Sequence, residues 1–362
     1  MTCRWLEGFE QFNYGTLSLY QASGKTVISG GSIRSETLQP VGGIGNGTRS
    51  IAISTRTNDV SILRFGFSSA GGCLSWLTSR NFQATPNALL NQNMCSLRNS
   101  DGDNLVKILV DQTFENTGDY EGEIGFVVGN TKIFSNLPVS LLNWQRWTLV
   151  YETSGTNVTA VRFYVGAILE VDWAGSIDVG DAATDRVVIG GEGNNTLATT
   201  MFDSFTFWDD PADEFEAIKA HWVHGLPVNA PVATTQGDWS SFDGVTTPSG
   251  DISARVADSS TTRGALTFVP DSELVLGYGD LPVGLNIDQI FAVAIWVRGQ
   301  GSADFPETEA YLKSGPNDGV STQENSEAGV TLIQTYPLDP NGNVSWTESA
   351  VNSLTVGVKV HI

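Results

Sequence analysis

The chain has 362 residues, of which 40% are hydrophobic and 10% aromatic, so it carries enough apolar material for packed cores and is not disordered throughout. Forty Asp and Glu stand against nineteen Lys and Arg, and the formal net charge of −21 repels nucleic-acid phosphates and anionic headgroups. We therefore expect no nucleic-acid partner and no membrane partner. No run reaches the roughly 18 apolar residues of a membrane span, and no secretory signal is expected from the opening residues.

Short β-type runs separated by turn residues fill the first part of the chain. They cover residues 48–54, 61–67, 105–114, 123–128, 147–152, 160–165, 186–189 and 202–208. In Val161–Val165 every second side chain would face one side of a sheet. Pairs such as Asp101-Gly102 and Ser154-Gly155 supply the positive φ of tight turns. Many short strands with regular turns predict a sandwich or jelly roll.

Residues 210–223 break this rhythm and predict a short helix. Asp210 is suited to accept the free N–H groups of the first turn, and Pro211 suits the first helical position. Glu214 complements the positive end of the helix dipole. The helix is expected to end a first domain of residues 1–224.

Three apolar residues of this helix are expected to pack on the sandwich. Phe215, Ile218 and Trp222 fall at i, i+3 and i+7, so they share one helix face.

The remainder divides into a linker and a second domain. Residues 225–250 are rich in Pro, Ser and Thr, which predicts an extended connector. A second β domain is expected over 251–362. Within it, 290–297 is apolar on both faces and predicts a central strand, and 353–362 alternates apolar and polar residues as a half-buried strand does.

Enzyme motifs are absent from the sequence. It contains no P-loop, dinucleotide-binding fingerprint, nucleophile elbow or H-E-x-x-H motif. Gly42–Gly47 is rich in glycine, but no helix follows to form a phosphate cradle, so it predicts a bend. His221 and His224 have a spacing that metal chelation allows, yet their place near a helix C-terminus favours a structural interpretation. His361 has no evident partner.

Two pairs of acidic residues come nearest to the carboxylate pair of a glycosidase. They are Glu121 with Glu123 and Glu170 with Asp172, and neither has the E-x-D-x-x-E spacing. We therefore predict no catalytic residue and no cofactor-binding residue.

Two oxygen-rich segments, Asn99–Asn104 and Asp178–Asp185, have the composition of calcium loops. An EF-hand loop counted from Asp101 would need Glu at position twelve, where Gln112 stands. We interpret both segments as solvated turns, with calcium binding as the alternative, and predict no metal ligand.

The sequence leaves the role of five tryptophans open, whereas it favours one interpretation of the three cysteines. A ring beside Gly, Ser or charged residues serves either sugar stacking or core packing, and the sequence does not choose between them. The residues concerned are Trp5, Trp76, Trp173, Trp239 and Trp346. Cys3, Cys73 and Cys95 form no C-x-x-C, so we interpret them as small buried hydrophobes.

The segment Leu142–Tyr151, followed by Val161–Gly166, resembles the laminin G and pentraxin-like branch of concanavalin A-like jelly rolls. Arg186–Gly191 looks like the next strand of that family, and Phe202–Trp208 looks like its closing strand. The resemblance covers roughly residues 5–224. Val165-Gly166-Ala167 replaces the Asn-Gly that the family often carries, and the family's calcium ligands have no assignable positions here.

The C-terminal part resembles a module at the end of tailed-bacteriophage virion proteins. The likeness runs from Ile290–Arg298 and Lys313–Gly315 through Asp339–Gly342 and Trp346–Glu348 to Val351–Leu354 and Gly357–Val360. The opening Trp5–Glu10 also looks like the start of such proteins. This resemblance implies a structural component of a phage particle.

The sequence thus predicts an all-β protein: a concanavalin A-like, laminin G-type β-sandwich, one short helix, and a second, smaller β-sandwich. Its expected role is non-enzymatic, as a capsid-decorating or head-, neck- or tail-associated protein of a virion assembled in the host cytoplasm. The expected partners are other virion proteins and further copies of itself. The alternatives are a carbohydrate-binding module for a host surface glycan and, third, a glycoside hydrolase. No cofactor is expected, with calcium as the alternative.

Overall fold

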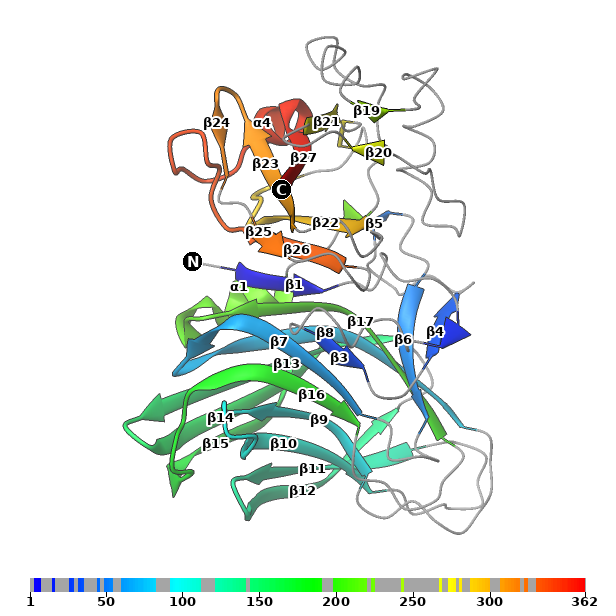
Figure 1. The fold of residues 1–362 in the computed structure, drawn as a ribbon. Helices are drawn as coiled ribbons and strands as arrows, with labels where there is room; N and C mark the ends of the chain where they lie inside the picture. Colours follow the sequence, from blue (N-terminus) through cyan, green and yellow to red (C-terminus); the bar gives the residue numbers. More distant parts are fainter. Residues whose placement is uncertain are drawn as a thin grey trace.

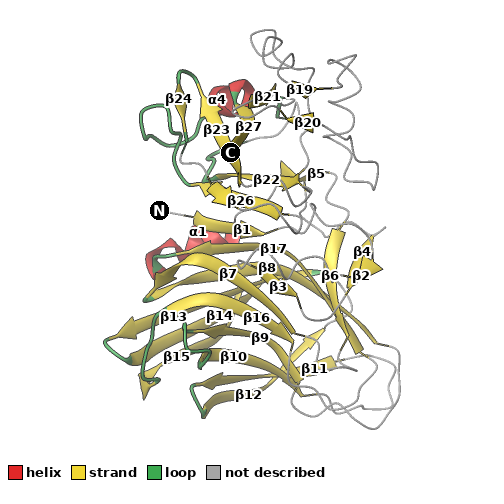
Figure 2. Cartoon of the chain, in the orientation of Figure 1, coloured by secondary structure: helices red, strands yellow, loops and turns green. Residues whose placement is uncertain are grey.

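Two large antiparallel β-sheets packed face to face form the main body of the computed structural model (Figure 1). The structure describes residues 3–7, 15–16, 26–28, 32–35, 44–45, 49–54, 60–82, 92–111, 121–140, 144–190, 198–219, 223–224, 242–243, 267–268, 273–277, 280–281, 287–299, 307–319, 322–324 and 330–361. Strands dominate these residues, and helices are few and short (Figure 2). The predicted all-β sandwich class is therefore confirmed.

The first sheet, called sheet A, has nine strands. Its order is β15 (Ile168–Asp178), β14 (Asn157–Val165), β13 (Gln145–Ser154), β8 (Gly71–Phe82), β17 (Ala198–Trp208), β6 (Arg49–Ser54), β4 (Ser32–Ser35) and β2 (Gly15–Thr16), and β1 (Cys3–Glu7) pairs with β17 beyond the end of β6. Every pairing in this sheet is antiparallel.

The second sheet, called sheet B, has seven strands. Its order is β12 (Thr131–Ser140), β11 (Glu121–Val128), β10 (Asn104–Asp111), β9 (Gln92–Arg98), β16 (Thr184–Gly190), β7 (Val60–Ser69) and β3 (Thr26–Ile28). All eight strand segments predicted from the sequence coincide with strands of these two sheets. The predicted turns at Asp101-Gly102 and Ser154-Gly155 also form, with φ of +91° at Gly102 and +59° at Gly155.

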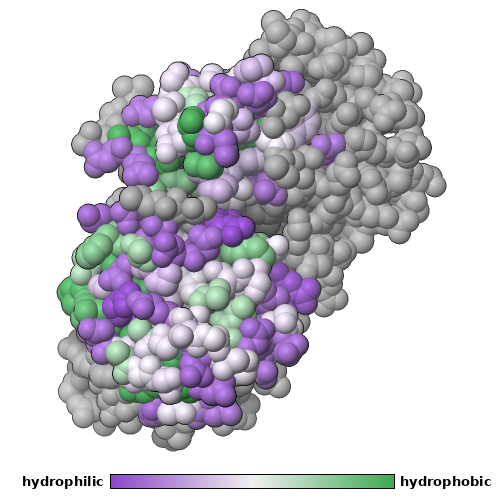
Figure 3. Space-filling model, turned by 90° about the vertical axis from the view of Figure 1, so that its left-hand side faces the viewer, coloured by the Kyte–Doolittle hydropathy of each residue, from purple (hydrophilic) through white to green (hydrophobic). Residues whose placement is uncertain are grey.

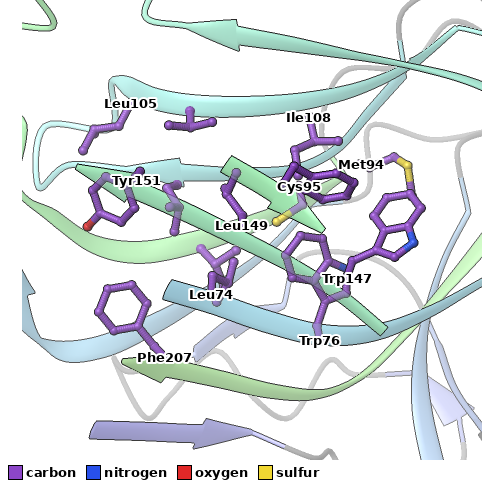
Figure 4. Close-up of a cluster of buried hydrophobic side chains, with 14 of the residues drawn as sticks. Leu74, Trp76, Met94, Cys95, Leu105, Ile108, Trp147, Leu149, Tyr151 and Phe207 are labelled. Atoms are coloured by element: carbon purple, nitrogen blue, oxygen red, sulfur yellow. The ribbon is translucent and has the colours of Figure 1, made fainter. Parts of the chain in front are cut away.

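The core between the sheets is built around aromatic rings (Figure 4). Trp147 contacts Phe163 with ring centroids 5.3 Å apart, and Trp76 lies 6.0 Å from Trp147. Phe126 reaches Phe163 from sheet B at 4.9 Å. Each such ring removes a large apolar area from water, so this cluster is the main source of the sandwich's stability.

The predicted helix begins as predicted but is shorter. A 3-10 turn, η1 (Pro211–Asp213), leads into α1 (Glu214–Lys219), and the Asp210 carboxylate accepts the Ala212 N–H at 2.9 Å. Ala217 is fully buried and Ile218 packs beside it, but Phe215 is 63% exposed. The prediction that Phe215 packs on the sandwich is wrong, because the helix turns Ala217 toward the sheet instead, and Trp222 lies outside the described residues.

A second β unit follows the helix. Its five-stranded sheet contains β21 (Glu273–Gly277), β27 (Thr355–His361), β23 (Glu307–Ser314), β24 (Asn317–Asp318) and β25 (Thr322–Glu324). A separate pair is formed by β22 (Val293–Gly299) and β26 (Val330–Tyr336). A second helix, α4 (Glu348–Ser353), was not predicted, although Thr347 caps it by accepting the Ala350 N–H. The terminal strand is confirmed, with Leu354 and Val356 in this unit's core.

The apolar run 290–297 is not a central strand, because β22 pairs with β26 alone within the described residues. The run is apolar throughout for a different reason. Phe291 and Ala292 pack against a cluster on the sandwich, whereas Val293 and Ile295 belong to the core of the second unit. One short segment therefore joins two apolar clusters.

Two short strand pairs complete the described elements: β5 (Ile44–Gly45) with β18 (Val223–His224), in parallel, and β19 (Phe242–Asp243) with β20 (Thr267–Phe268). Most of Gly42–Gly47 and, apart from 242–243, the predicted linker 225–250 lie outside the described residues. The domain boundaries therefore stay predictions.

Most of the questioned Trp side chains are core residues. Trp5, Trp76 and Trp346 are buried, and Trp173 packs against the sandwich core, whereas Trp239 lies outside the described residues. The three cysteines are free and buried, as predicted, and burial raises the pKa of each thiol far above its ordinary value.

Candidate functional site on the outer face of sheet A

The strands of sheet A turn a row of polar side chains away from the sandwich core. Because side chains alternate along a strand, the residues between the core positions of β13 and β14 share the outer face. Strand register aligns Trp208, Cys73, Val150, Arg162 and Asp172 across five strands. The next row is Thr206, Ser75, Thr148, Tyr164 and Leu169, and the row after that contains Asp203, Leu77 and Arg146.

An ionic network ties α1 to this face. Arg162 Nε donates to Glu214 Oε2 at 2.6 Å, and Arg162 Nη1 donates to Glu152 Oε1 at 2.7 Å. The Tyr164 hydroxyl donates to Glu214 Oε1. Both oxygens of Glu214 thus accept a hydrogen bond, and the network holds the first turn of the helix on β14.

Hydrogen bonds in this network outweigh the effect of burial on the charge of Arg162. Burial alone would lower the pKa of the Arg162 guanidinium, but its hydrogen bonds to Glu152 and Glu214 raise that pKa above its ordinary value. Burial and the hydrogen bond to Glu214 raise the pKa of Tyr164 to about 12. Arg162 is therefore charged and Tyr164 is protonated at neutral pH.

Buried hydroxyls continue the polar row toward β17. Thr148 Oγ1 donates to Ser75 Oγ at 3.0 Å, and Arg146 Nη1 donates to the same oxygen at 3.1 Å. The Trp208 indole N–H donates to Thr206 Oγ1 at 3.2 Å. Ser75, Thr148 and Thr206 are at most 2% exposed, so the hydrogen bonds between Thr148 and Ser75 and between Trp208 and Thr206 compensate the loss of water.

A backbone irregularity lies next to Asp203, in the row that contains Leu77 and Arg146. The register between β17 and β8 shifts between Asp203 and Thr206, and Ser204 has a positive φ of 51°. The Ser204 N–H donates to the Asp203 carboxylate at 2.6 Å, which holds this local bulge.

The second β unit meets the sandwich at the end of this face. Phe291 packs edge-on against Trp208 with ring centroids 4.9 Å apart. Cys3, Cys73 and Ala217 complete the buried cluster around Trp208. Strand β26 also lies beside β1, as Figure 1 shows, so the second unit covers the edge of sheet A. We call this contact the seam.

The two oxygen-rich turns predicted from the sequence are brought together at one end of the sandwich. Asn99 Nδ2 donates to the Asp181 carbonyl at 3.3 Å, and Arg186 donates to both the Ser100 carbonyl and the Asp185 carboxylate. Their polar groups thus bind each other and an arginine. Among the described residues, no group of three or more His, Cys, Asp or Glu side chains is arranged to hold a metal ion.

The acidic pairs and histidines singled out from the sequence do not meet at one place. Asp172 lies opposite Arg162, and Glu170 lies on the same edge strand, β15. Glu121 and Glu123 pair with β12 in the other sheet. His221 lies outside the described residues, and nothing is described of the side chains of His224 and His361.

Sequence reasoning missed the residues that the fold does assemble. Glu214 was considered only as a helix-dipole residue, and Arg162 and Arg146 only as parts of strands. The alternation of Val161–Val165 does carry one signal, because it places Arg162 and Tyr164 together on the face opposite the core.

No family model and no curated protein matches this chain. Several solved structures are similar to part of this chain. The alginate lyase Aly36B aligns with 11% identity and a TM-score of 0.39, over 57% of this chain and 97% of its own. A carbohydrate esterase of the Shiga toxin-encoding bacteriophage phi24B aligns with 13% identity and a TM-score of 0.37, over 57% and 97%. Peanut lectin aligns with 10% identity and a TM-score of 0.35, over 56% and 96%. At this level of similarity no residue role is transferred.

None of the described helices has the length and apolar character that crossing a membrane requires.

Proposed function

We propose that this protein is a non-enzymatic structural component of a bacteriophage particle and acts through protein–protein packing. The sequence resemblance of its C-terminal part to phage virion modules suggests the particle. The seam supports the mode of action, because it joins the two β units through a shared buried cluster instead of a bare linker. Two β units joined in this way present a fixed surface to neighbouring proteins.

The observation that carries the packing role is a pair of exposed apolar side chains beside the ionic network. Leu169, the strand partner of Tyr164, is 45% exposed, and Phe215, which follows Glu214, is 63% exposed. The tie between Tyr164 and Glu214 therefore fixes both apolar side chains on one rigid support. Figure 3 shows that hydrophilic, intermediate and hydrophobic areas alternate over the described surface on one side of the molecule. Ile168, the chain neighbour of Leu169, is 66% exposed as well, and exposed apolar side chains that gather into a patch with a polar rim mark protein contact sites.

Particle composition tests the proposal directly. Mass analysis of purified particles from the phage that encodes this chain is expected to find it in stoichiometric amounts. Leu169→Ser combined with Phe215→Ser is expected to reduce its incorporation. The matched control is Val344→Ser, which removes a 54% exposed side chain from the second unit. Absence of the native protein from particles would refute the proposal.

The second candidate function is recognition of a host surface glycan, and the polar outer face of sheet A favours it. The Arg162 guanidinium and the Glu152 carboxylate are partly exposed on that face, at 23% and 42% of their side chains, and both groups can form hydrogen bonds with sugar hydroxyls. A glycan array probed with the full chain, with and without calcium, tests this function. Signal no higher than background under both conditions would count against it.

A further inference from the structure

Arg146 has more hydrogen-bonding capacity than its surroundings use. Among the described residues, its guanidinium has one side-chain acceptor, Ser75 Oγ at 3.1 Å, for five N–H donors. The side chain is half-buried, and none of its remaining nitrogens is both buried and unpaired. These donors therefore face outward from a partly desolvated position, where a charged hydrogen bond is stronger than in bulk water.

The surroundings of Arg146 hold the guanidinium in place. Thr148 donates to the same Ser75 oxygen, and both hydroxyl residues are fully buried. On one side Arg146 is paired with the buried Leu77. On the other side the Gly166 N–H donates to the Arg146 carbonyl at 2.7 Å, and a Cβ added at Gly166 would meet no atom within 4 Å. Ser75 thus anchors the guanidinium from β8, and the surface above Gly166, beside the Arg146 main chain, is open.

Charge restricts what can bind there. Burial lowers the pKa of Arg146 to about 10 while the carboxylate of Asp203 raises it, so the guanidinium is charged at neutral pH. The same carboxylate opposes a doubly charged ligand, and the net charge of −21 repels polyanions at longer range. A planar carboxylate matches the fork of donors on a guanidinium.

We propose that Arg146 is a binding site for a singly charged carboxylate, carried by a sugar acid or by a small organic acid. Two N–H groups of the guanidinium bind the two carboxylate oxygens, and Ser75 holds the third donor in place. This site is independent of the packing role and involves neither Leu169 nor Phe215.

Titration calorimetry on the full chain tests the proposal with galacturonate, acetate, glucose and inorganic phosphate. Galacturonate and acetate are expected to bind and to compete with each other, whereas glucose gives no heat. Tighter binding of galacturonate than of acetate assigns the site to a sugar acid, and equal binding assigns it to a small organic acid. Failure of both carboxylates to bind, equal binding of glucose, or tighter binding of phosphate would overturn the proposal.

Variants locate the site. Arg146→Met is expected to weaken carboxylate binding by about tenfold or more, the loss that follows removal of hydrogen bonds to a charged group. Arg186→Met, at an arginine engaged by Asp185 and Ser100, is the matched control and is expected to bind as the native chain does. If Arg146→Met does not fold, Arg146→Lys keeps the charge without the fork and is expected to bind more weakly. Native affinity in either Arg146 variant would refute the assignment.

Discussion

The two faces of sheet A are built from the same strands but have opposite chemistry. On β14, Phe163 points into the aromatic core, and its neighbour Tyr164 joins the ionic network on the outer face. The inner face depends on shape and apolar area, whereas the outer face depends on hydrogen-bond geometry and charge. Because the side-chain period of a strand is two, one register fixes both faces, and a slip by one residue would destroy both.

Removal of an inner-face ring is expected to have the largest effect. Phe163→Ala takes away contacts with Trp76, Trp147 and Phe126, and should lower the free energy of unfolding by about 3–5 kcal/mol. Chemical denaturation followed by tryptophan fluorescence measures the change. The adjacent Tyr164→Phe variant is the control for the outer face and should lose far less. Similar losses in the two variants would contradict the division between the faces.

Breaking the outer network is expected to cost less. Glu214→Gln removes the charge that accepts from Arg162 and Tyr164, and should lower the free energy of unfolding by about 1–3 kcal/mol. Glu152 binds the same arginine but is 42% exposed. Glu152→Gln should therefore change the free energy of unfolding by only about 0–1 kcal/mol. Denaturation at low and at high salt measures both, and an equal effect of the two variants would show that Glu214 has no special position.

High pH is expected to weaken the outer face through the ionisation of Tyr164. The folded state raises the pKa of Tyr164 from an ordinary value of 10 to about 12, so it keeps a proton that the unfolded chain releases first. The resulting stability is complete below pH 10 and is lost as pH rises from 10 through 12. Tyr164→Phe should therefore show a flatter fall of unfolding free energy in this range. Tyr336, whose pKa burial also raises to about 12, supplies an unchanged contribution in both proteins. An identical slope in the variant and the native chain would argue against the network.

The smallest effect is expected at the exposed helix residue. Phe215→Ser should change the free energy of unfolding by no more than about 0.5 kcal/mol, because the ring is 63% exposed. Ile218→Ser, one turn further on the buried side, should be more destabilising by about 1 kcal/mol. Thermal melts of the two variants measure the difference. A larger loss of stability in Phe215→Ser than in Ile218→Ser would show that Phe215 packs on the sandwich, as the sequence predicted.

The inner face could largely be predicted from the sequence, and the outer face could not. Alternation in segments such as Val161–Val165 reports local geometry, so strands and their core positions follow from it. The partner of Arg162 is Glu214, 52 residues away, and it arrives only because α1 packs over β13 and β8. Register between distant strands likewise brings Arg146 to Ser75. No local sequence pattern encodes the contact of Arg162 with Glu214 or that of Arg146 with Ser75.

The prediction for Phe215 failed for a related reason. A spacing of i, i+3 and i+7 shows which residues share a helix face, but packing decides which face meets the sheet, and in α1 the fully buried residue is Ala217. Asp210 and Pro211, whose effects act within one turn, were interpreted correctly. Capping chemistry is local and could be inferred, whereas the buried face of a short helix depends on what it packs against.

The pairing of β1 with β17 has a consequence for synthesis of the chain. Arg4 binds Asp209 at a separation of 205 residues, and Cys3 lies opposite Trp208. A ribosome must therefore deliver the 205 residues that follow Arg4, up to Asp209, before β1 finds its neighbour. During that interval the exposed backbone of β1 is a target for intermolecular association, so a nascent chain of this protein should benefit from chaperones until β17 emerges.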